Sequence, residues 1–119
     1  MIEWGILGTG SIAKIFARAI KTSKKSRLFG VASRSARNAK EFSSVFDCSG
    51  FAGYHELINH KNVDAIYIAT PHPFHFDLAF KSLEKEKSVL CEKPLAMNAT
   101  ETMILIHMAK KNNLLLMEA

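Results

Sequence analysis

The first 13 residues restrict the possible folds of this chain more than any other stretch. An apolar run from Ile2 to Leu7 leads directly into Gly8-Thr9-Gly10-Ser11-Ile12-Ala13, and an amphipathic segment follows. We interpret this order as a strand, a tight turn and a helix. Gly8 permits a turn that a side chain blocks, Gly10 lets the backbone approach a bound pyrophosphate, and Ala13 lets the helix pack near the strand.

This Gly-x-Gly-x-x-Ala pattern predicts a bound dinucleotide whose phosphates lie against free amides at the positive end of the helix. Glycine turns are common, so a strand-to-helix turn without any ligand is the alternative. A second apolar strand follows where a dinucleotide-binding fold needs one, and this favours the dinucleotide.

Length and composition limit the class of protein. A chain of 119 residues is the size of one domain, and an apolar fraction of 48% is enough for a core. No apolar run reaches the roughly 20 residues that span a bilayer, and Met1-Ile2-Glu3 lacks the basic start of a signal peptide. Cys48 and Cys91 form neither a disulfide framework nor a zinc site. We expect a reduced, cytoplasmic protein without a membrane partner, in which Cys91 is buried in a strand.

The positive charge is concentrated at the N-terminal end of the chain. Residues 1–40 contain nine Lys or Arg residues and one acid, a net charge of +8, whereas residues 41–119 carry −3. A basic segment of this kind can bind nucleic acid. The sequence has no helix-turn-helix pattern, no zinc-ligand spacing and no aromatic RNA-binding signature, so we expect no nucleic acid partner.

Short apolar strands alternate with amphipathic helices along the whole chain. We expect strands at 2–7, 27–33, 51–52, 63–69, 88–91 and 114–117, and helices at 11–22, 37–46, 55–59, 76–85 and 99–112. The expected buried face of the first helix consists of Ile12, Ile15, Phe16, Ala19 and Ile20. This order predicts the α/β class, as a doubly wound parallel sheet of Rossmann type with about six strands and flanking helices.

In such a sheet, ligands bind outside the carboxyl ends of the strands. The unusual loops of this chain all follow predicted strands, at Gly8–Ala13, Ser33–Arg37, Thr70–His75 and Glu92–Pro94. We therefore expect these loops to converge into one site, although they are far apart in the sequence.

The end of the second strand bears on the choice of cofactor. This strand ends at Ser33 and Arg34, and Arg37 follows one turn into the next helix. Folds that prefer NAD place a carboxylate here, which binds the ribose 2′-hydroxyl and repels a 2′-phosphate. Guanidinium groups bind phosphate, so we expect NADP, with NAD as the alternative. The alternative is that Arg34 and Arg37 are ordinary exposed charges, or that Arg34 only stacks on the adenine of either cofactor.

Two further loops carry candidate side chains. His72 and His75 lie in a proline-rich loop without a Cys or carboxylate at ligand spacing, so we expect packing or cofactor contact and no metal. Lys93, fixed between Glu92 and Pro94, is the candidate catalytic residue, because its ammonium can bind the nicotinamide ribose, polarise a substrate oxygen or relay a proton. A salt bridge from Lys93 to Glu92 is the alternative, and Pro94 can follow a cis bond.

Four motifs together resemble the N-terminal domain of the Gfo/Idh/MocA oxidoreductase family, over the whole chain. They are Gly8–Ala13, Ala32-Ser33-Arg34-Ser35, Ala69–His75 and Cys91-Glu92-Lys93-Pro94-Leu95-Ala96, and the final Met117-Glu118-Ala119 is also similar. The Glu-Lys-Pro motif is the most specific of these. Within the family, the chain looks most like the dimeric dihydrodiol dehydrogenases and the NADP-dependent D-xylose dehydrogenases. Many members carry Asn where this chain has His72.

The resemblance implies a role for each motif. The implied pyrophosphate site consists of Gly8, Thr9, Gly10, Ser11 and Ile12, and the implied 2′-phosphate site of Ser33, Arg34 and Arg37. The residues implied beside the ribose and nicotinamide are Thr70, His72 and His75, with Glu92 and Lys93 at the reacting end.

Members of this family continue into a second α/β domain with a substrate pocket, an Asp/His-type catalytic pair and a dimer surface. The resemblance therefore implies an NADP-dependent oxidoreductase that moves hydride between nicotinamide and a sugar or trans-dihydrodiol, a homodimer in its full-length form. We expect residues 1–119 to be its dinucleotide-binding domain without the substrate domain, able to bind cofactor but to turn over little or nothing. A stand-alone NAD(P)-binding module without catalysis is the alternative.

Overall fold

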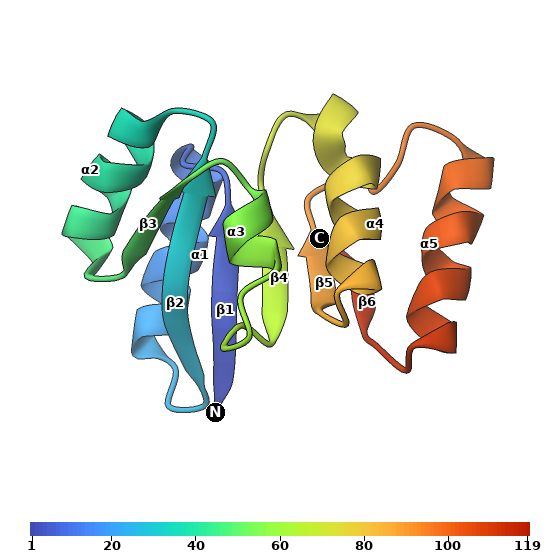
Figure 1. Cartoon of the computed structure of the whole chain (residues 1–119), viewed down its shortest axis with the longest axis horizontal. Coiled ribbons are helices and arrows are strands. Elements are labelled where there is room, and N and C mark those ends of the chain that lie inside the picture. Colours follow the sequence, from blue (N-terminus) through green and yellow to red (C-terminus); the bar gives the residue numbers. More distant parts are fainter.

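Six parallel strands form one sheet in the computed structural model, which describes residues 1–119. They are β1 (Ile2–Leu7), β2 (Ser26–Ser33), β3 (Ser49–Ala52), β4 (Ala65–Ile68), β5 (Ser88–Cys91) and β6 (Leu116–Glu118). Their order in the sheet is β3-β2-β1-β4-β5-β6, so the order changes direction between β1 and β4 (Figure 1). This confirms the predicted doubly wound sheet of Rossmann type.

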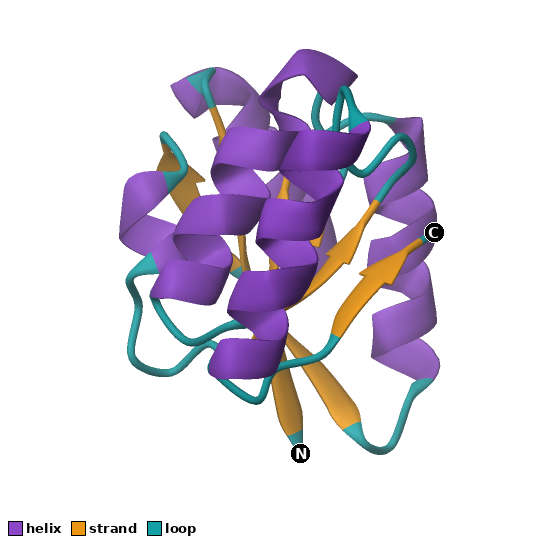
Figure 2. Ribbon diagram, turned by 90° about the vertical axis from the view of Figure 1, so that its right-hand side faces the viewer, coloured by secondary structure: helices purple, strands orange, loops and turns teal.

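Helices cover both faces of the sheet (Figure 2). They are α1 (Ser11–Thr22), α2 (Ala36–Phe46), α3 (His55–Ile58), α4 (His75–Glu84) and α5 (Ala99–Lys111), with a 3-10 turn, η1 (His72–Phe74), before α4. Side chains of α1 and α2 pack with strand residues such as Ile6 and Val31. Those of α3, α4 and α5 pack with the next residues along, such as Leu7 and Ala32, because alternate strand residues face opposite sides. None of the helices combines the length and apolarity needed to cross a membrane.

The buried face of α1 differs from the prediction. The residues that α1 buries are Ala13, Ala17 and Ile20, with Phe16 half-buried. Three residues of the predicted face are exposed instead: Ile12, Ile15 and Ala19. The prediction was wrong because this helix contacts the sheet through small side chains. Ala13 and Ala17 let the helix approach the strands closely, and this orientation turns the two larger isoleucines toward solvent.

Two strands begin later than predicted, each for a local reason. β4 begins two residues later, because the Asp64 carboxylate, rather than a strand carbonyl, accepts the Glu3 N–H at 2.8 Å. β6 also begins two residues later, because the Leu114 N–H still donates to the Ala109 carbonyl of α5 at 2.8 Å. Side-chain and helix-end hydrogen bonds therefore shorten the strands that the apolar runs predict.

The turn after β1 depends on Gly8. Its φ is +111°, and a Cβ at this position would lie 2.5 Å from the Ala69 carbonyl oxygen. The Gly8 N–H donates to the Ala32 carbonyl at 2.9 Å, which fixes the turn against β2 as well. The predicted requirement for glycine is thus explained by a close approach of two backbone segments.

We expect Gly8→Ala to lower the free energy of unfolding by about 3 kcal/mol, because the methyl group adds a backbone clash to a left-handed φ. Urea unfolding followed by circular dichroism measures the loss. Gly53→Ala is the matched control, since Gly53 has a φ of +91° but its Cβ would meet nothing within 4 Å. We expect this control to lose only about 1 kcal/mol; equal losses would contradict the clash.

Cys91 is fully buried at the end of β5, as predicted, and burial raises the pKa of its thiol from 9.0 to about 12. Unfolding exposes this thiol, which then ionises near its ordinary pKa, whereas the folded protein keeps the proton. The contribution of Cys91 to stability is therefore complete below pH 9 and is lost progressively as the pH rises toward about 12.

We expect the free energy of unfolding to decline as the pH is raised above about 9, and Cys91→Ala to reduce that decline. The variant is less stable at neutral pH because it leaves a cavity. Cys48, whose pKa burial raises to about 11, accounts for part of the remaining decline. Urea titrations of both proteins at a series of pH values measure the slopes, and parallel slopes would disprove the role of Cys91.

Candidate functional site

Three of the four loops predicted to converge meet in one cleft at the carboxyl edge of the sheet, namely those after β1, β2 and β4. The fourth, Glu92–Pro94 after β5, does not line this cleft. A cleft of about 390 Å³ lies among the loops after β1, β2, β3 and β4. Its lining consists of Gly8, Thr9, Gly10, Ser33, Arg34, Asn38, Tyr54, Ala69, Thr70 and Pro71. The structure thus brings together predicted site residues from three separate parts of the chain.

The N-terminus of α1 offers free amides at this cleft. The first hydrogen bond of the helix joins the Lys14 N–H to the Gly10 carbonyl at 3.2 Å, and no side chain caps the helix. The N–H groups of Ser11, Ile12 and Ala13 therefore have no partner within the helix. A Cβ at Gly10 would meet nothing within 4 Å, so the space beside these amides is open. Free amides beside open space fit the pyrophosphate of a dinucleotide.

Of the two predicted arginines, the structure brings only Arg34 into the cleft. Its guanidinium carbon lies 5.0 Å from the centroid of the Phe74 ring, a cation–π contact that orients the charge. Ser33 beside it is buried, and its hydroxyl accepts a backbone N–H at 3.1 Å. Arg37 lies on the exposed side of α2, where its Nε donates to the Glu41 carboxylate at 3.1 Å.

In the loop after β4, only Thr70 of the three predicted residues lines the cleft. His72 is exposed at the start of η1. His75 is 1% exposed, and both of its ring nitrogens lie within hydrogen-bond distance of backbone carbonyls. This arrangement favours the packing alternative for His75. No cluster of three His, Cys, Asp or Glu side chains forms anywhere in the chain.

The loop after β5 holds a fixed carboxylate and a free ammonium. The Tyr67 hydroxyl donates to the Glu92 carboxylate at 2.5 Å, and burial together with this bond raises the pKa of Tyr67. Lys93 is exposed and forms no ion pair, so the alternative of a salt bridge to Glu92 is wrong. The peptide bond between Lys93 and Pro94 is cis. The Lys93 ammonium is thus available to a ligand.

Five residues at the cleft were missing from the prediction. Asn38, Tyr54, Ala69 and Pro71 line it, and Phe74 supports Arg34. Ala69, Pro71 and Phe74 belong to the Ala69–His75 motif, so the sequence contained a local signal for them. Asn38 and Tyr54 belong to no motif, and only the strand order brings them to the cleft.

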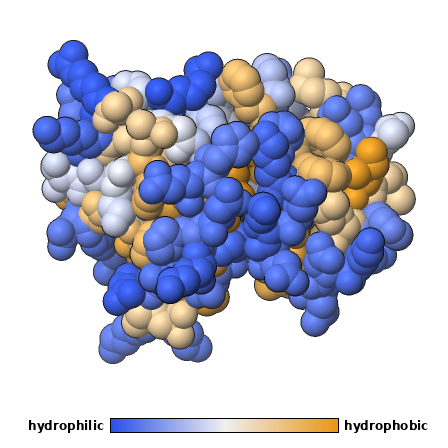
Figure 3. Space-filling view, viewed as in Figure 1, coloured by the Kyte–Doolittle hydropathy of each residue, from blue (hydrophilic) through white to orange (hydrophobic).

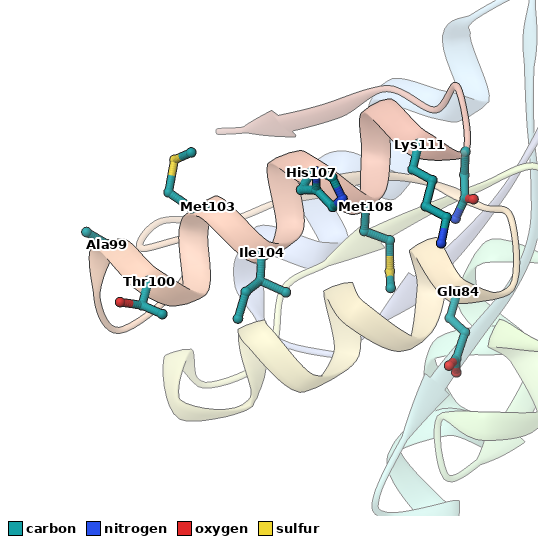
Figure 4. Close-up of a pocket in the computed structure, with 9 residues that line it drawn as sticks. Glu84, Ala99, Thr100, Met103, Ile104, His107, Met108 and Lys111 are labelled. Carbon is teal, nitrogen blue, oxygen red and sulfur yellow. The ribbon is translucent and has the colours of Figure 1, made fainter.

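A larger hollow of about 860 Å³ lies away from this cleft, between α4 and α5. Ile104 and Met108 point from α5 toward α4 (Figure 4), and apolar side chains gather on this side of the molecule (Figure 3). None of the predicted site residues lines it. Volume alone therefore does not locate the site, whereas the glycine turn and the strand ends do.

Comparison with known families identifies the family of this chain. Residues 2–119 match the family described as "Oxidoreductase family, NAD-binding Rossmann fold". The chain belongs to the Gfo/Idh/MocA oxidoreductase family. This confirms the resemblance drawn from the four motifs.

Two curated relatives of this family member are enzymes. The trans-1,2-dihydrobenzene-1,2-diol dehydrogenase of Xenopus laevis is 38% identical over 120 residues, which cover 98% of this chain and 36% of that protein. The D-xylose 1-dehydrogenase (NADP(+)) of Hypocrea jecorina is 38% identical over 131 residues, which cover 99% of this chain and 34% of that protein. The chain thus spans about a third of the length of the curated relatives that it matches.

A solved structure shows the same fold with a cofactor. The 3-ketoreductase KijD10 of Actinomadura kijaniata, in complex with NADP, has a TM-score of 0.94 and 31% identity to this chain. The match covers 98% of this chain and 38% of that one. The strand order and the placement of the loops are therefore those of an oxidoreductase of known structure.

We expect Gly10→Ala to weaken the binding of a nicotinamide dinucleotide at least about tenfold, because the methyl group fills the open space beside the α1 amides. The free energy of unfolding should change by less than about 1 kcal/mol, since the added Cβ touches nothing. Fluorescence titration with NADPH and NADH, together with urea unfolding, separates the two effects. Unchanged binding would show that the pyrophosphate lies elsewhere.

Proposed function

We propose that this chain is the dinucleotide-binding domain of an NADP-dependent oxidoreductase that exchanges hydride between nicotinamide and a CH–OH carbon of a sugar or trans-dihydrodiol. The cleft at the glycine turn supports this proposal, because it joins an anion-binding helix end to the strand ends where such folds bind ligands. The substrates named for the two relatives support the choice of a sugar or a dihydrodiol.

The position of Arg34 carries the assignment of NADP. No carboxylate lines the cleft, and a guanidinium held by Phe74 stands at the end of β2 instead. A 2′-phosphate gains charge-assisted hydrogen bonds there, and it meets no negative side chain. Ser33 lines the cleft beside Arg34. Arg37 reaches the 2′-phosphate only by giving up Glu41, so its contribution is smaller than that of Arg34.

Lys93 is the catalytic residue in this proposal. When bound, the nicotinamide ring supplies the hydride exchange. The free Lys93 ammonium binds the ribose beside that ring, polarises the substrate oxygen and holds the proton that the oxygen gains or loses. Glu92, fixed by Tyr67, keeps negative charge near this position. Thr70 and His72 border the ribose and the nicotinamide.

We propose a cytoplasmic homodimer for the complete protein, without nucleic acid or membrane partners. Both cysteines are free thiols, Cys91 is buried and Cys48 is half-buried, which suits a reducing compartment. The small-molecule substrate binds between this domain and the remainder of the enzyme.

We expect Arg34→Ala to weaken NADPH binding about 30-fold, because the 2′-phosphate loses a charge-assisted partner, and to change NADH binding less than about threefold. Fluorescence titration of the chain with each cofactor measures both affinities.

The matched control is Arg27→Ala, which removes the same charge from the opposite end of β2, where Arg27 pairs with Glu3. We expect unchanged affinity for both cofactors. Equal affinities of the wild-type chain for NADPH and NADH would overturn the assignment of NADP and keep the fold. Absence of binding of either cofactor would overturn the proposed site.

A further inference from the structure

His75 connects the loop after β4, which lines the cleft at Thr70, with the loop after β5. Its Nδ1 lies 2.7 Å from the Pro94 carbonyl oxygen, in the loop after β5, and its Nε2 lies 2.8 Å from the Thr70 carbonyl oxygen, in the loop after β4. The side chain is 1% exposed, so water has almost no access to the ring. One imidazole therefore bridges two loops that are separated by more than twenty positions in the sequence.

The two partners determine the charge of the ring. A carbonyl oxygen only accepts hydrogen bonds, so both ring nitrogens must donate for both contacts to be favourable. Neutral imidazole carries one N–H, and in that form a nitrogen lone pair faces an oxygen lone pair. Only the imidazolium satisfies both carbonyls at these distances.

No charged side chain stabilises the imidazolium, so its hydrogen-bond partners are the two carbonyls. Apart from Glu84 at the far end of α4, four carboxylates lie on the elements around the ring: Asp77 in α4, Glu92 after β5, Glu101 in α5 and Glu118 in β6. Each has another partner, in turn the Lys81 ammonium, the Tyr67 hydroxyl, the Met97 N–H and the Leu95 N–H. The other titratable groups of these elements near the loops are His72, Cys91 and Lys93. No carboxylate binds the ring, and the start of α4 opposes its positive charge.

We propose that His75 is a positioning residue whose imidazolium holds the Thr70 loop against the Lys93–Pro94 loop, so that one buried proton keeps the cofactor site assembled. This inference rests on the proposed function, because Thr70 lines the cleft and Pro94 follows the catalytic Lys93. His75 itself touches no cofactor or substrate. It acts through the two carbonyls, which set how far Lys93 stands from the cleft.

The direction of the pH effect follows from this geometry. At lower pH the imidazolium donates to both loops, and the site is assembled. As the pH rises and the ring loses a proton, one of the two contacts becomes repulsive and the loops separate. NADPH affinity should therefore fall about tenfold when the ring is deprotonated, the loss expected for one charge-assisted hydrogen bond.

The protonation state can be measured directly in the 119-residue chain without cofactor. In spectra of chain labelled with 15N in its imidazole rings, we expect both His75 nitrogens to carry protons at neutral pH. Single variants of His55, His60, His72 and His107 assign the other four histidines, so the His75 signal is identified in protein with His75 intact. A ring with one lone-pair nitrogen at every pH would overturn the inference.

NADPH titrations over the same pH range test the link to the cleft. We expect affinity to follow the His75 protonation curve, and His75→Asn to bind about tenfold more weakly at neutral pH with no such pH dependence. The matched control is His107→Asn, an exposed position in α5, which should keep the wild-type affinity and pH dependence. An NADPH affinity that does not change when the His75 ring gains or loses its proton would overturn the inference. Absence of NADPH binding at every pH would instead overturn the proposed function.

Discussion

The close contact between Gly8 and the end of β4 is the constraint on which the cleft depends. The Gly8 N–H is bound to β2 through the Ala32 carbonyl at 2.9 Å, and the Ala69 N–H is bound to β1 through the Leu7 carbonyl at 2.8 Å. These bonds draw the loops after β1, β2 and β4 together where the strand order changes direction. A side chain at position 8 would force these loops apart, and the free amides of α1 would no longer face the other walls of the cleft.

Most of the fold could be predicted from the sequence, because its strands are short apolar runs that end at glycine, proline or polar residues. The failures concern orientation and strand ends. The helical period alone identifies a stripe of apolar residues, and in α1 the larger ones, Ile12 and Ile15, dominate that stripe. The sheet accepts the smaller Ala13 and Ala17 instead. The Gly-x-Gly-x-x-Ala motif indicates close packing at Ala13, but nothing in the helical period indicates it at Ala17. The start of β6 depends on a hydrogen bond to the end of α5, which periodicity does not reveal.

The site could be predicted to the level of its loops but not of every side chain. Arg34 and the glycine turn lie at the carboxyl edge of the sheet, because a residue that follows a parallel strand must lie there. Within a loop, however, neighbouring residues can point in opposite directions. His75 and Arg37 both lie close to the cleft loops in the sequence, but the His75 ring turns inward to two backbone carbonyls and the Arg37 guanidinium turns outward to Glu41. The Tyr67 hydroxyl reaches the Glu92 carboxylate because β4 and β5 are neighbours in the sheet. A local sequence motif does not reveal which strands are neighbours.

The change of strand order between β1 and β4 also divides the cleft between two halves of the chain. Residues up to Tyr54 build the end that holds Arg34, and Ala69, Thr70 and Pro71 build the other end. The two halves meet at the Gly8 turn, which packs against Ala69, and again where the Arg34 guanidinium lies over the Phe74 ring. In the proposed function, the residue that selects the nucleotide therefore also contacts the loop that carries Thr70, so a substitution at Arg34 removes a contact between the two halves of the cleft.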